Sequence, residues 1–305
     1  MAFRSAFFVL VAASFAAFAC SASGGGSKVG DDGADGVTGG ATGSGGTTNI
    51  PGGTGGSAAI LEPGTPPDAG ADCDSVLEVT YRDFSEAHPD FEMDFRGDVV
   101  RRGLVAPALG ADQKPTFLNN VGCPAEPMTP LACANWTVTT PTLSTAEAFA
   151  QWYTDVPDVN ITFEKQLELT ETPPGSGEYT FDSTSFFPLE PSEGFGVTPA
   201  GHYTGKNYLF TTEIHVKFGY RAGQLFTFRG DDDLWIFVNG KLALDLGSLH
   251  GPELGTIDFD AQAATLGISP GQTYSMDIFH AERHTDGSNF RVTTNIACFT
   301  DVIVR

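Results

Sequence analysis

The sequence predicts a mainly β fold: an antiparallel β-sandwich with one short helix, preceded by a disordered tether rich in Gly, Ser and Thr. Two observations predict the sandwich. Several short segments alternate apolar and polar residues with turn residues between them, and one of them contains a hairpin around Asn239-Gly240. A third observation predicts the tether, because no aromatic residue occurs between Phe18 and Tyr81. Such a segment buries too little apolar surface to offset its ordering entropy.

The N-terminus is typical of an export signal, with Arg4 followed by an apolar run at 7–18 that is too short to span a membrane. The residues before Cys20 resemble a bacterial lipobox, in which Cys20 would be lipidated after cleavage, although Phe18 is bulkier than that pattern prefers. Simple secretion with cleavage before Cys20 is the alternative. We therefore expect a signal peptide at 1–19, a linker at 20–72 and a folded domain at 73–305. Membrane contact would be through the lipid alone.

Five cysteines are present, and lipidation of Cys20 would leave four, enough for two disulfides in an oxidising compartment. Three connectivities are possible, and the sequence does not choose among them. We favour Cys73–Cys298, whose members lie at the two ends of the domain, and Cys123–Cys133, which brackets a Pro-rich loop. None of the spacings resembles a zinc site.

The strand signals are alternating apolar residues that place one face of each segment in a core. They occur at Ile214 to Tyr220, Leu225 to Phe228, Tyr274 to Ile278 and Val292 to Ile296. A helix is expected near Ser144 to Tyr153, since Ser144 and Glu147 form a capping box. Residues 84–135 are less regular and Pro-rich, which indicates loops and short strands packed against the sandwich.

The hairpin around Asn239-Gly240 predicts a two-residue type I′ turn, which determines the register of its strands. This register pairs Val238 with Lys241, Phe237 with Leu242, and Trp235 with Leu244. Cross-strand partners share a face, so Trp235, Phe237, Leu242 and Leu244 would form one apolar patch that lies on a second layer.

The hairpin is preceded by Asp231-Asp232-Asp233. Three adjacent carboxylates repel one another, and a bound cation would offset that repulsion; hard oxygen ligands favour calcium or magnesium. Neighbouring side chains of an extended chain point to opposite faces, whereas a cis peptide between two of the residues would turn both carboxylates to one side. A solvated acidic turn is the alternative.

The segment 230–250 resembles the signature of bacterial fibro-slime domains. These domains are similar to the β-sandwich module of anthrax protective antigen and yeast flocculins. Segments 81–92, 151–160 and 279–290 also resemble fibro-slime landmarks, so the resemblance covers roughly residues 75–300. It implies a jelly-roll type of sandwich. In the sugar-binding members of the wider group, a cis Asp-Asp pair holds a calcium ion that contacts sugar hydroxyls.

By this resemblance, Asp231 and Asp232 would hold the calcium ion, together with Asp286 and Asn289 from a late loop. An ordinary Asp-Gly turn between strands is the alternative for that loop. The candidate ligand-binding residues are Asp233 and His250. His250 would either line the same end of the sandwich or simply close a loop.

Charge argues against nucleic acid as a partner, because the chain has a formal net charge of −22 and repels phosphate backbones. The segment from His280 to His284 differs from zinc protease motifs in the position of its Glu. It also continues a strand, where positions four apart are about 13 Å apart, too far to share one ion. Glu282 and Arg283 are better explained as a structural ion pair.

No enzyme is expected, since neither a nucleophile elbow nor a phosphate-binding glycine loop occurs. Paired glycosidase carboxylates have no sequence spacing that would reveal them, so a polysaccharide hydrolase is the least favoured reading. We expect instead a surface-anchored extracellular protein that binds carbohydrate or matrix polysaccharide through calcium, in adhesion. It would be an outer-membrane lipoprotein at a bacterial cell surface, or part of an extracellular matrix. The alternative is a structural matrix component in which calcium only stabilises the fold.

Overall fold

The computed structural model describes residues 75–93, 99–124, 133–134, 136–199, 205–285 and 287–302. All of these residues belong to one structural unit. The predicted signal peptide and linker, with Cys20, lie outside the described ranges. Among the described residues, no helix has the length and apolar character that crossing a bilayer requires.

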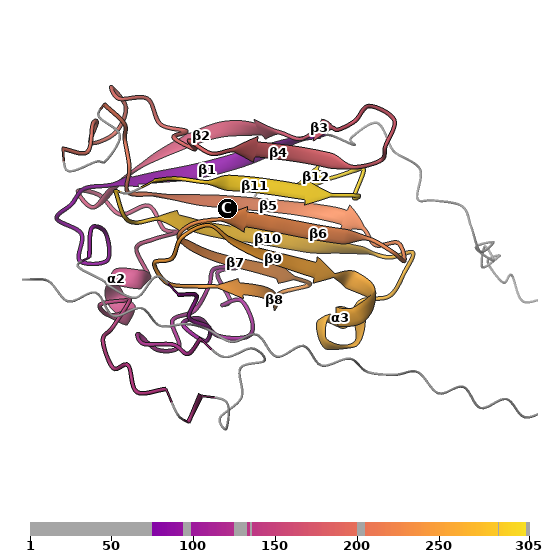
Figure 1. The fold of residues 1–305 in the computed structure, drawn as a ribbon, viewed down its shortest axis with the longest axis horizontal. Helices are drawn as coiled ribbons and strands as arrows, with labels where there is room; N and C mark the ends of the chain where they lie inside the picture. The colour runs from indigo at the N-terminus through magenta and orange to yellow at the C-terminus, as the bar shows by residue number, and fades with distance from the viewer. Residues whose placement is uncertain are drawn as a thin grey trace, which may run out of the picture. The chain divides into compact units, whose positions relative to one another are not determined.

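Two antiparallel sheets form the architecture, which confirms the predicted mainly β, two-layered fold (Figure 1). Within the described ranges, the larger sheet has seven strands. Its order is β2 (Asn160–Glu168), β1 (Val76–Phe84), β5 (Phe210–Gly219), β10 (Thr273–Glu282), β7 (Asp233–Val238) and β8 (Lys241–Leu246), with β12 (Thr300–Asp301) beside β5. The smaller sheet has the order β3 (Thr170–Glu171), β4 (Tyr179–Ser183), β11 (Phe290–Thr294), β6 (Leu225–Gly230) and β9 (Glu253–Asp258).

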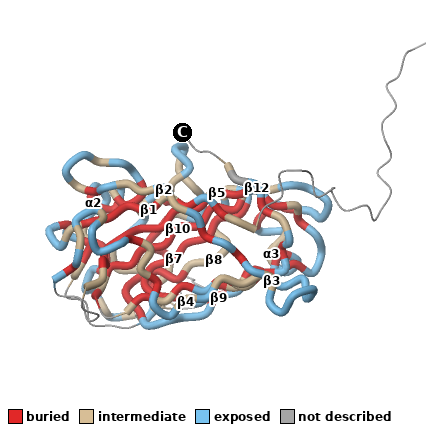
Figure 2. The backbone as a smooth tube through the Cα atoms, turned by 90° about the horizontal axis from the view of Figure 1, so that it is seen from above, coloured by how far each residue is buried: buried red, intermediate tan, exposed pale blue. Residues whose placement is uncertain are grey.

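The core between the sheets follows from the predicted alternation. Alternate residues of β5, β6, β10 and β11 face this core, and most of them are apolar and buried, as Ile214, Val216, Phe228, Met276 and Val292 illustrate. Figure 2 shows the same pattern along the backbone, with buried residues gathered on the strands and exposed ones on the connections.

A second apolar cluster covers the other face of the larger sheet. Trp235 and Phe237 of β7 and Phe279 of β10 pack there against loop residues, among them Trp152 and Phe91. All six residues of β7 are therefore buried, because the strand has an apolar layer on both faces. The described loop residues between 84 and 124 pair through isolated bridges such as Val105 with Phe117, as the irregular sequence predicted.

The hairpin register was predicted correctly only next to the turn. Val238 pairs with Lys241 and Phe237 with Leu242, but a β-bulge then shifts the register, so that Trp235 faces Asp245. The extra residue sends Leu244 to the opposite face, where it packs in the core between the sheets. The predicted pairing of Trp235 with Leu244 was therefore wrong.

Two helices lie in the described part of the chain, at opposite ends of the sandwich (Figures 1 and 2). Helix α2 (Ala146–Phe149) is shorter than predicted, and its N-cap is Thr145, whose hydroxyl accepts a hydrogen bond from the Ala148 N–H, not Ser144. Helix α3 (Phe259–Leu266) was not predicted. It begins at the N-cap Asp258, whose carboxylate accepts from the Ala261 N–H.

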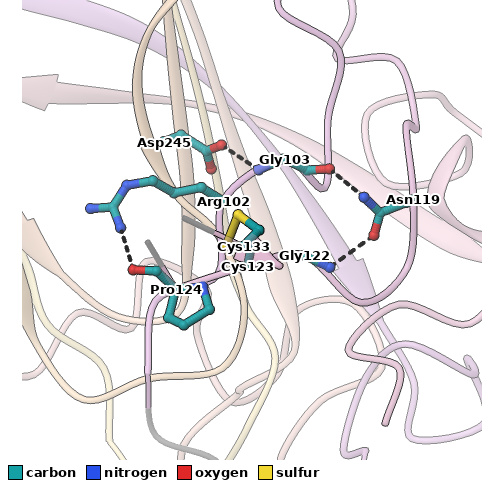
Figure 3. The surroundings of a disulfide bond; sticks show 8 residues. All are labelled: Arg102, Gly103, Asn119, Gly122, Cys123, Pro124, Cys133 and Asp245. Atoms are coloured by element: carbon teal, nitrogen blue, oxygen red, sulfur yellow. Dashed lines mark hydrogen bonds between the residues drawn. A yellow bond between two sulfur atoms is a disulfide. The ribbon is translucent and has the colours of Figure 1, made fainter. Parts of the chain in front are cut away.

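The predicted disulfide between Cys123 and Cys133 is present, with Cα atoms 5.8 Å apart. Figure 3 shows how the adjoining loop is held: the Gly103 N–H donates to Asp245 Oδ2 at 2.8 Å, and Asn119 Nδ2 donates to the Gly103 carbonyl at 2.9 Å. Cys298 is also disulfide-bonded. Its predicted partner Cys73 lies outside the described residues.

Candidate functional site

The candidate site lies where the chain crosses from the smaller sheet to the larger one. Asp231 and Asp232 follow β6 directly and precede β7, so they lie at one end of the sandwich, between its layers. The peptide bond between them is cis, as predicted. Their side chains are buried, with residue exposures of 7 % and 6 %.

Asp231 contacts the predicted partner Asn289. Asp231 Oδ1 accepts a hydrogen bond from the Asn289 backbone N–H at 2.6 Å, and Oδ2 accepts from Asn289 Nδ2 at 2.9 Å. Asn289 directly precedes β11, the neighbour of β6, so the strand pairing brings together two residues that are far apart in the sequence. The fourth predicted metal ligand, Asp286, lies outside the described residues.

Asp232 contacts two further segments. Its Oδ1 accepts from the His250 N–H at 3.3 Å, and its Oδ2 accepts from the Arg283 N–H at 3.0 Å. The His250 ring is within hydrogen-bonding distance of two carbonyl oxygens, Gly251 O at 2.7 Å and Leu246 O at 3.2 Å. His250 therefore lies at the same end of the sandwich as the Asp pair, and its ring faces its own loop.

Asp233 lies behind the pair and is fully buried. Its carboxylate accepts from the Ser248 N–H and from Arg283 Nε, each at 2.6 Å. Arg283 also donates to the carbonyl oxygens of Asp90 and Thr142. Because its carboxylate is paired with the buried guanidinium of Arg283, we interpret Asp233 as a positioning residue; its predicted role in ligand binding stays a prediction.

The predicted ion pair between Glu282 and Arg283 is wrong, since Arg283 pairs with Asp233. Consecutive residues of β10 point to opposite faces, which separates the two side chains. Glu282 is instead buried on the core face, and within the described part of the chain its Oε2 has no hydrogen-bond partner. Sequence reasoning missed it as a site residue, although the alternation of Met276 and Ile278 continues to Glu282 and could have placed it there.

Burial governs the ionisation of these acids. It raises the pKa of Asp231, and it raises the pKa of Asp232 to about 7 although the Arg283 charge opposes the shift. Burial, and then the charges of Asp232 and Asp231, raise the pKa of Glu282 well above its usual range. The site therefore favours protonated carboxyls when no cation is bound.

His280 supports the backbone of this site. Burial lowers its pKa to about 4, so the ring is neutral at physiological pH. Its Nε2 lies 2.8 Å from the Asp231 carbonyl oxygen, and its Nδ1 lies 3.2 Å from Thr212 Oγ1. Because a carbonyl oxygen only accepts, Nε2 carries the proton and Nδ1 accepts from the hydroxyl.

The donor set suits a hard cation. Asp231, Asp232 and Glu282 are buried carboxyls, and the guanidinium beside them is bound to Asp233. Buried carboxylates without cationic partners are costly, and calcium prefers such oxygen ligands. No group of three or more His, Cys, Asp or Glu side chains in the described ranges is arranged to hold a metal. A calcium ion here would thus take the Asp pair together with amide or carbonyl oxygens, for which Asn289 is in place.

No family model matches the chain. Two proteins of Dictyostelium discoideum are similar to it: psiD is 36 % identical over 225 residues, covering 72 % of this chain and 41 % of psiD, and psiC is 32 % identical over 228 residues, covering 72 % and 40 %. The matched region is thus about two fifths of the length of these relatives. They come from a eukaryote and no fibro-slime model matches, so the predicted bacterial fibro-slime assignment was wrong. These relatives give no support to the predicted location in a bacterial outer membrane.

Solved structures are less similar to this chain in sequence than these relatives are. One is a "PA14 sugar-binding domain from RTX adhesin", 17 % identical, with a TM-score of 0.20 over 30 % of this chain and 49 % of that one. Another comes from work on carbohydrate-binding modules of the β-sandwich superfamily, 10 % identical, with a TM-score of 0.18 over 47 % and 69 %. The fold class therefore rests on the strand pairing of the chain itself.

Proposed function

We propose that this domain is an extracellular binding module that recognises carbohydrate through a calcium ion held by Asp231 and Asp232. The observation that supports this best is the group of buried carboxyls at the β6–β7 junction, whose pKa values burial raises although Arg283, paired with Asp233, lies beside them. A divalent cation would relieve that imbalance, whereas a purely structural cluster would be expected to contain its own counter-charge.

Each residue has a distinct role in this proposal. Asp231 and Asp232 bind the ion, and Asn289, which already contacts Asp231, completes the ligand set. Asp233 and Arg283 hold the pair against the loop layer. When bound, the calcium ion supplies positive charge and open coordination positions for vicinal hydroxyl oxygens. The site binds reversibly, and no catalytic residue is assigned to it.

Export is part of the proposal and is supported by the disulfide chemistry. The Cys123–Cys133 bond and the disulfide at Cys298 are typical of an oxidising compartment. The net charge of −22 disfavours nucleic acid as a partner and suits a calcium-rich exterior. Carbohydrate, free or in a matrix, is therefore the proposed partner.

Calorimetric titration of calcium and then of simple sugars into wild type and Asp232→Ala tests the proposal. Glu178→Ala is the matched control, because it removes the same charge from an exposed turn. We expect calcium affinity to be lost in Asp232→Ala and kept in Glu178→Ala. Equal calcium affinity in wild type and both variants would contradict the proposed calcium site. Calcium binding without any sugar binding would indicate that the ion only stabilises a structural matrix component. Turnover of a polysaccharide would contradict a pure binding role.

A further inference from the structure

The outer face of the smaller sheet presents two arginines side by side. Arg229 of β6 and Arg291 of β11 are direct cross-strand partners, and both are exposed. Like charges in this position are destabilising. The pair also stands out by composition, since the chain has only 16 Lys and Arg residues against 38 Asp and Glu. Their juxtaposition therefore indicates an anionic partner.

Neither arginine is fully engaged within the protein. Arg291 Nε donates to Thr293 Oγ1 at 3.4 Å, and its Nη1 is 3.7 Å from Asp182 Oδ2. The side chains of Arg291 and Asp182 are about half exposed, so this ion pair contributes little. Among the residues that the structure describes, Arg229 forms no ion pair or side-chain hydrogen bond. The buried Arg82 and Arg283, by contrast, are both ion-paired. Two guanidinium groups are thus available to a ligand on this face.

The arginine pair adjoins the acidic site. Arg229 is two residues before Asp231, and Arg291 is two residues after Asn289. Side chains two positions apart on a strand share a face and lie roughly 7 Å apart. The ladder also continues to the site, because the Asp231 N–H donates to the Asn289 carbonyl at 3.4 Å. The arginines are therefore the next row along β6 and β11 from the proposed calcium ligands.

Beyond the arginines, the same face continues with hydroxyl groups. Thr227 and Thr293 form the next cross-strand pair along β6 and β11. They belong to a row that crosses the whole smaller sheet: Thr170, Thr180, Thr293, Thr227 and Thr256. Threonine hydroxyls both donate and accept hydrogen bonds, as sugar hydroxyls do. Arginine and then threonine side chains thus extend from the acidic site along the outer face of β6 and β11.

We propose that Arg229 and Arg291 bind an anionic group, a carboxylate or a sulfate, on the saccharide whose hydroxyls the site recognises. This inference rests on the proposed function and specifies its ligand as an acidic saccharide that lies along β6 and β11. A guanidinium pairs with such oxyanions through two parallel hydrogen bonds, which gives geometric selectivity as well as charge. The arginine pair also offsets, at short range, the repulsion that the acidic protein exerts on such a ligand.

The test uses the full chain with saturating calcium chloride and three probes. Hyaluronan oligosaccharides present carboxylates, dextran sulfate presents sulfates, and dextran is neutral. The variants are Arg229→Thr, Arg291→Thr and their combination, since threonine suits a strand. Arg221→Thr is the matched control: Arg221 is exposed in the turn after β5, and the variant loses the same charge. Thermal unfolding of each variant verifies that the fold is retained.

We expect at least one anionic probe to bind more tightly than dextran, and the stronger of the two identifies carboxylate or sulfate. Each single variant should weaken that binding roughly tenfold, with dextran unaffected and Arg221→Thr within about twofold of wild type. Equal binding of the anionic probes by wild type and the double variant would overturn the inference, as would equal affinity for all three probes.

Chelation separates this inference from the proposed function. If binding of the anionic probe requires the arginines but persists in EDTA and in Asp232→Ala, the arginine subsite is supported and the calcium site is contradicted. If EDTA abolishes binding but the arginine variants bind as wild type does, the calcium site is supported and the arginine subsite is contradicted.

Discussion

Two clusters of buried charge in this molecule differ in their balance. In the first, Glu213 on β5 accepts hydrogen bonds from Arg82 at 2.5 Å and from His215 at 2.6 Å, and also pairs with Lys114. His215 bridges onward to Asp277 at 2.7 Å. Burial by itself would raise the pKa of Glu213, but the hydrogen bond from His215 and the nearby positive charges hold it at about 2.

The acidic site at the β6–β7 junction has the opposite outcome. Its carboxyls are buried to a similar degree, yet the pKa values of Asp231, Asp232 and Glu282 are all raised by that burial. The difference teaches that burial alone does not decide the ionisation of a carboxyl; the hydrogen bonds and positive charges around its charged form can outweigh burial. The Glu213 carboxylate is satisfied by partners within the protein, whereas we propose that a bound cation completes the acidic site.

The largest expected effect comes from breaking the one balanced pair inside the acidic site. Arg283→Met leaves Asp233 buried without its cation, so we expect the free energy of unfolding to fall by about 3–5 kcal/mol. Urea unfolding at pH 7 measures this loss. Arg221→Met, at an exposed turn, is the control and should stay within about 0.5 kcal/mol of wild type. A comparably small loss in Arg283→Met would contradict the role assigned to Asp233.

A smaller loss is expected in the balanced cluster. Glu213→Gln keeps the shape but removes the charge that Arg82, Lys114 and His215 share, and it should lower the free energy of unfolding by about 2 kcal/mol. Urea unfolding again provides the measurement. If stability rises instead, the cluster was not balanced, and the contrast between the two regions fails.

The matching change in the acidic site should have the opposite sign. Burial raises the pKa of Glu282, so at pH 7 folding must protonate its carboxyl; Glu282→Gln removes that cost, and in EDTA it should raise the free energy of unfolding by about 1 kcal/mol. Glu178→Gln, on an exposed turn, is the control for the change in net charge and should have no measurable effect. A destabilised Glu282→Gln would mean that the hydrogen bonds to Glu282 from Ser288 and the His284 backbone outweigh the cost of burying its carboxyl.

The smallest effect concerns pH and sharpens the description of the balanced cluster. His215 is buried, which lowers its pKa, but its hydrogen bonds to Asp277 and Glu213 raise the pKa above 6.5 overall. The folded state therefore holds the proton more tightly than the unfolded state. This contribution is fully present below about pH 6.5 and is lost as pH rises through the folded-state pKa.

We expect the stability difference between wild type and His215→Gln to shrink by up to about 1 kcal/mol between pH 6 and pH 9. Chemical unfolding at several pH values measures it. Arg82 and Lys114 also face this cluster, through their ion pairs with Glu213. A difference that stays constant with pH would mean that His215 is not charged in the folded state.

Much of the fold was predictable because its signals are local. Alternation placed Ile214 and Val216 in the core, and Asn239-Gly240 located the hairpin turn, since each depends on residues within a few positions. Chain order also suggested the Cys123–Cys133 pair, which closes a short loop. The bulge that turns Leu244 to the other face depends on packing between the layers, so no local sequence pattern predicts it.

The sequence by itself determined the strand faces and the carboxylate pair Asp231-Asp232. Only the tertiary structure decided which partners those carboxylates have. Asn289, 58 positions after Asp231, lies beside it because β11 pairs with β6. Arg283 contacts both Asp233 and Asp90 because the loop layer packs on β10, although Asp90 lies 193 positions before Arg283. Contacts between distant segments follow from strand order and layer packing, which a local sequence pattern does not encode.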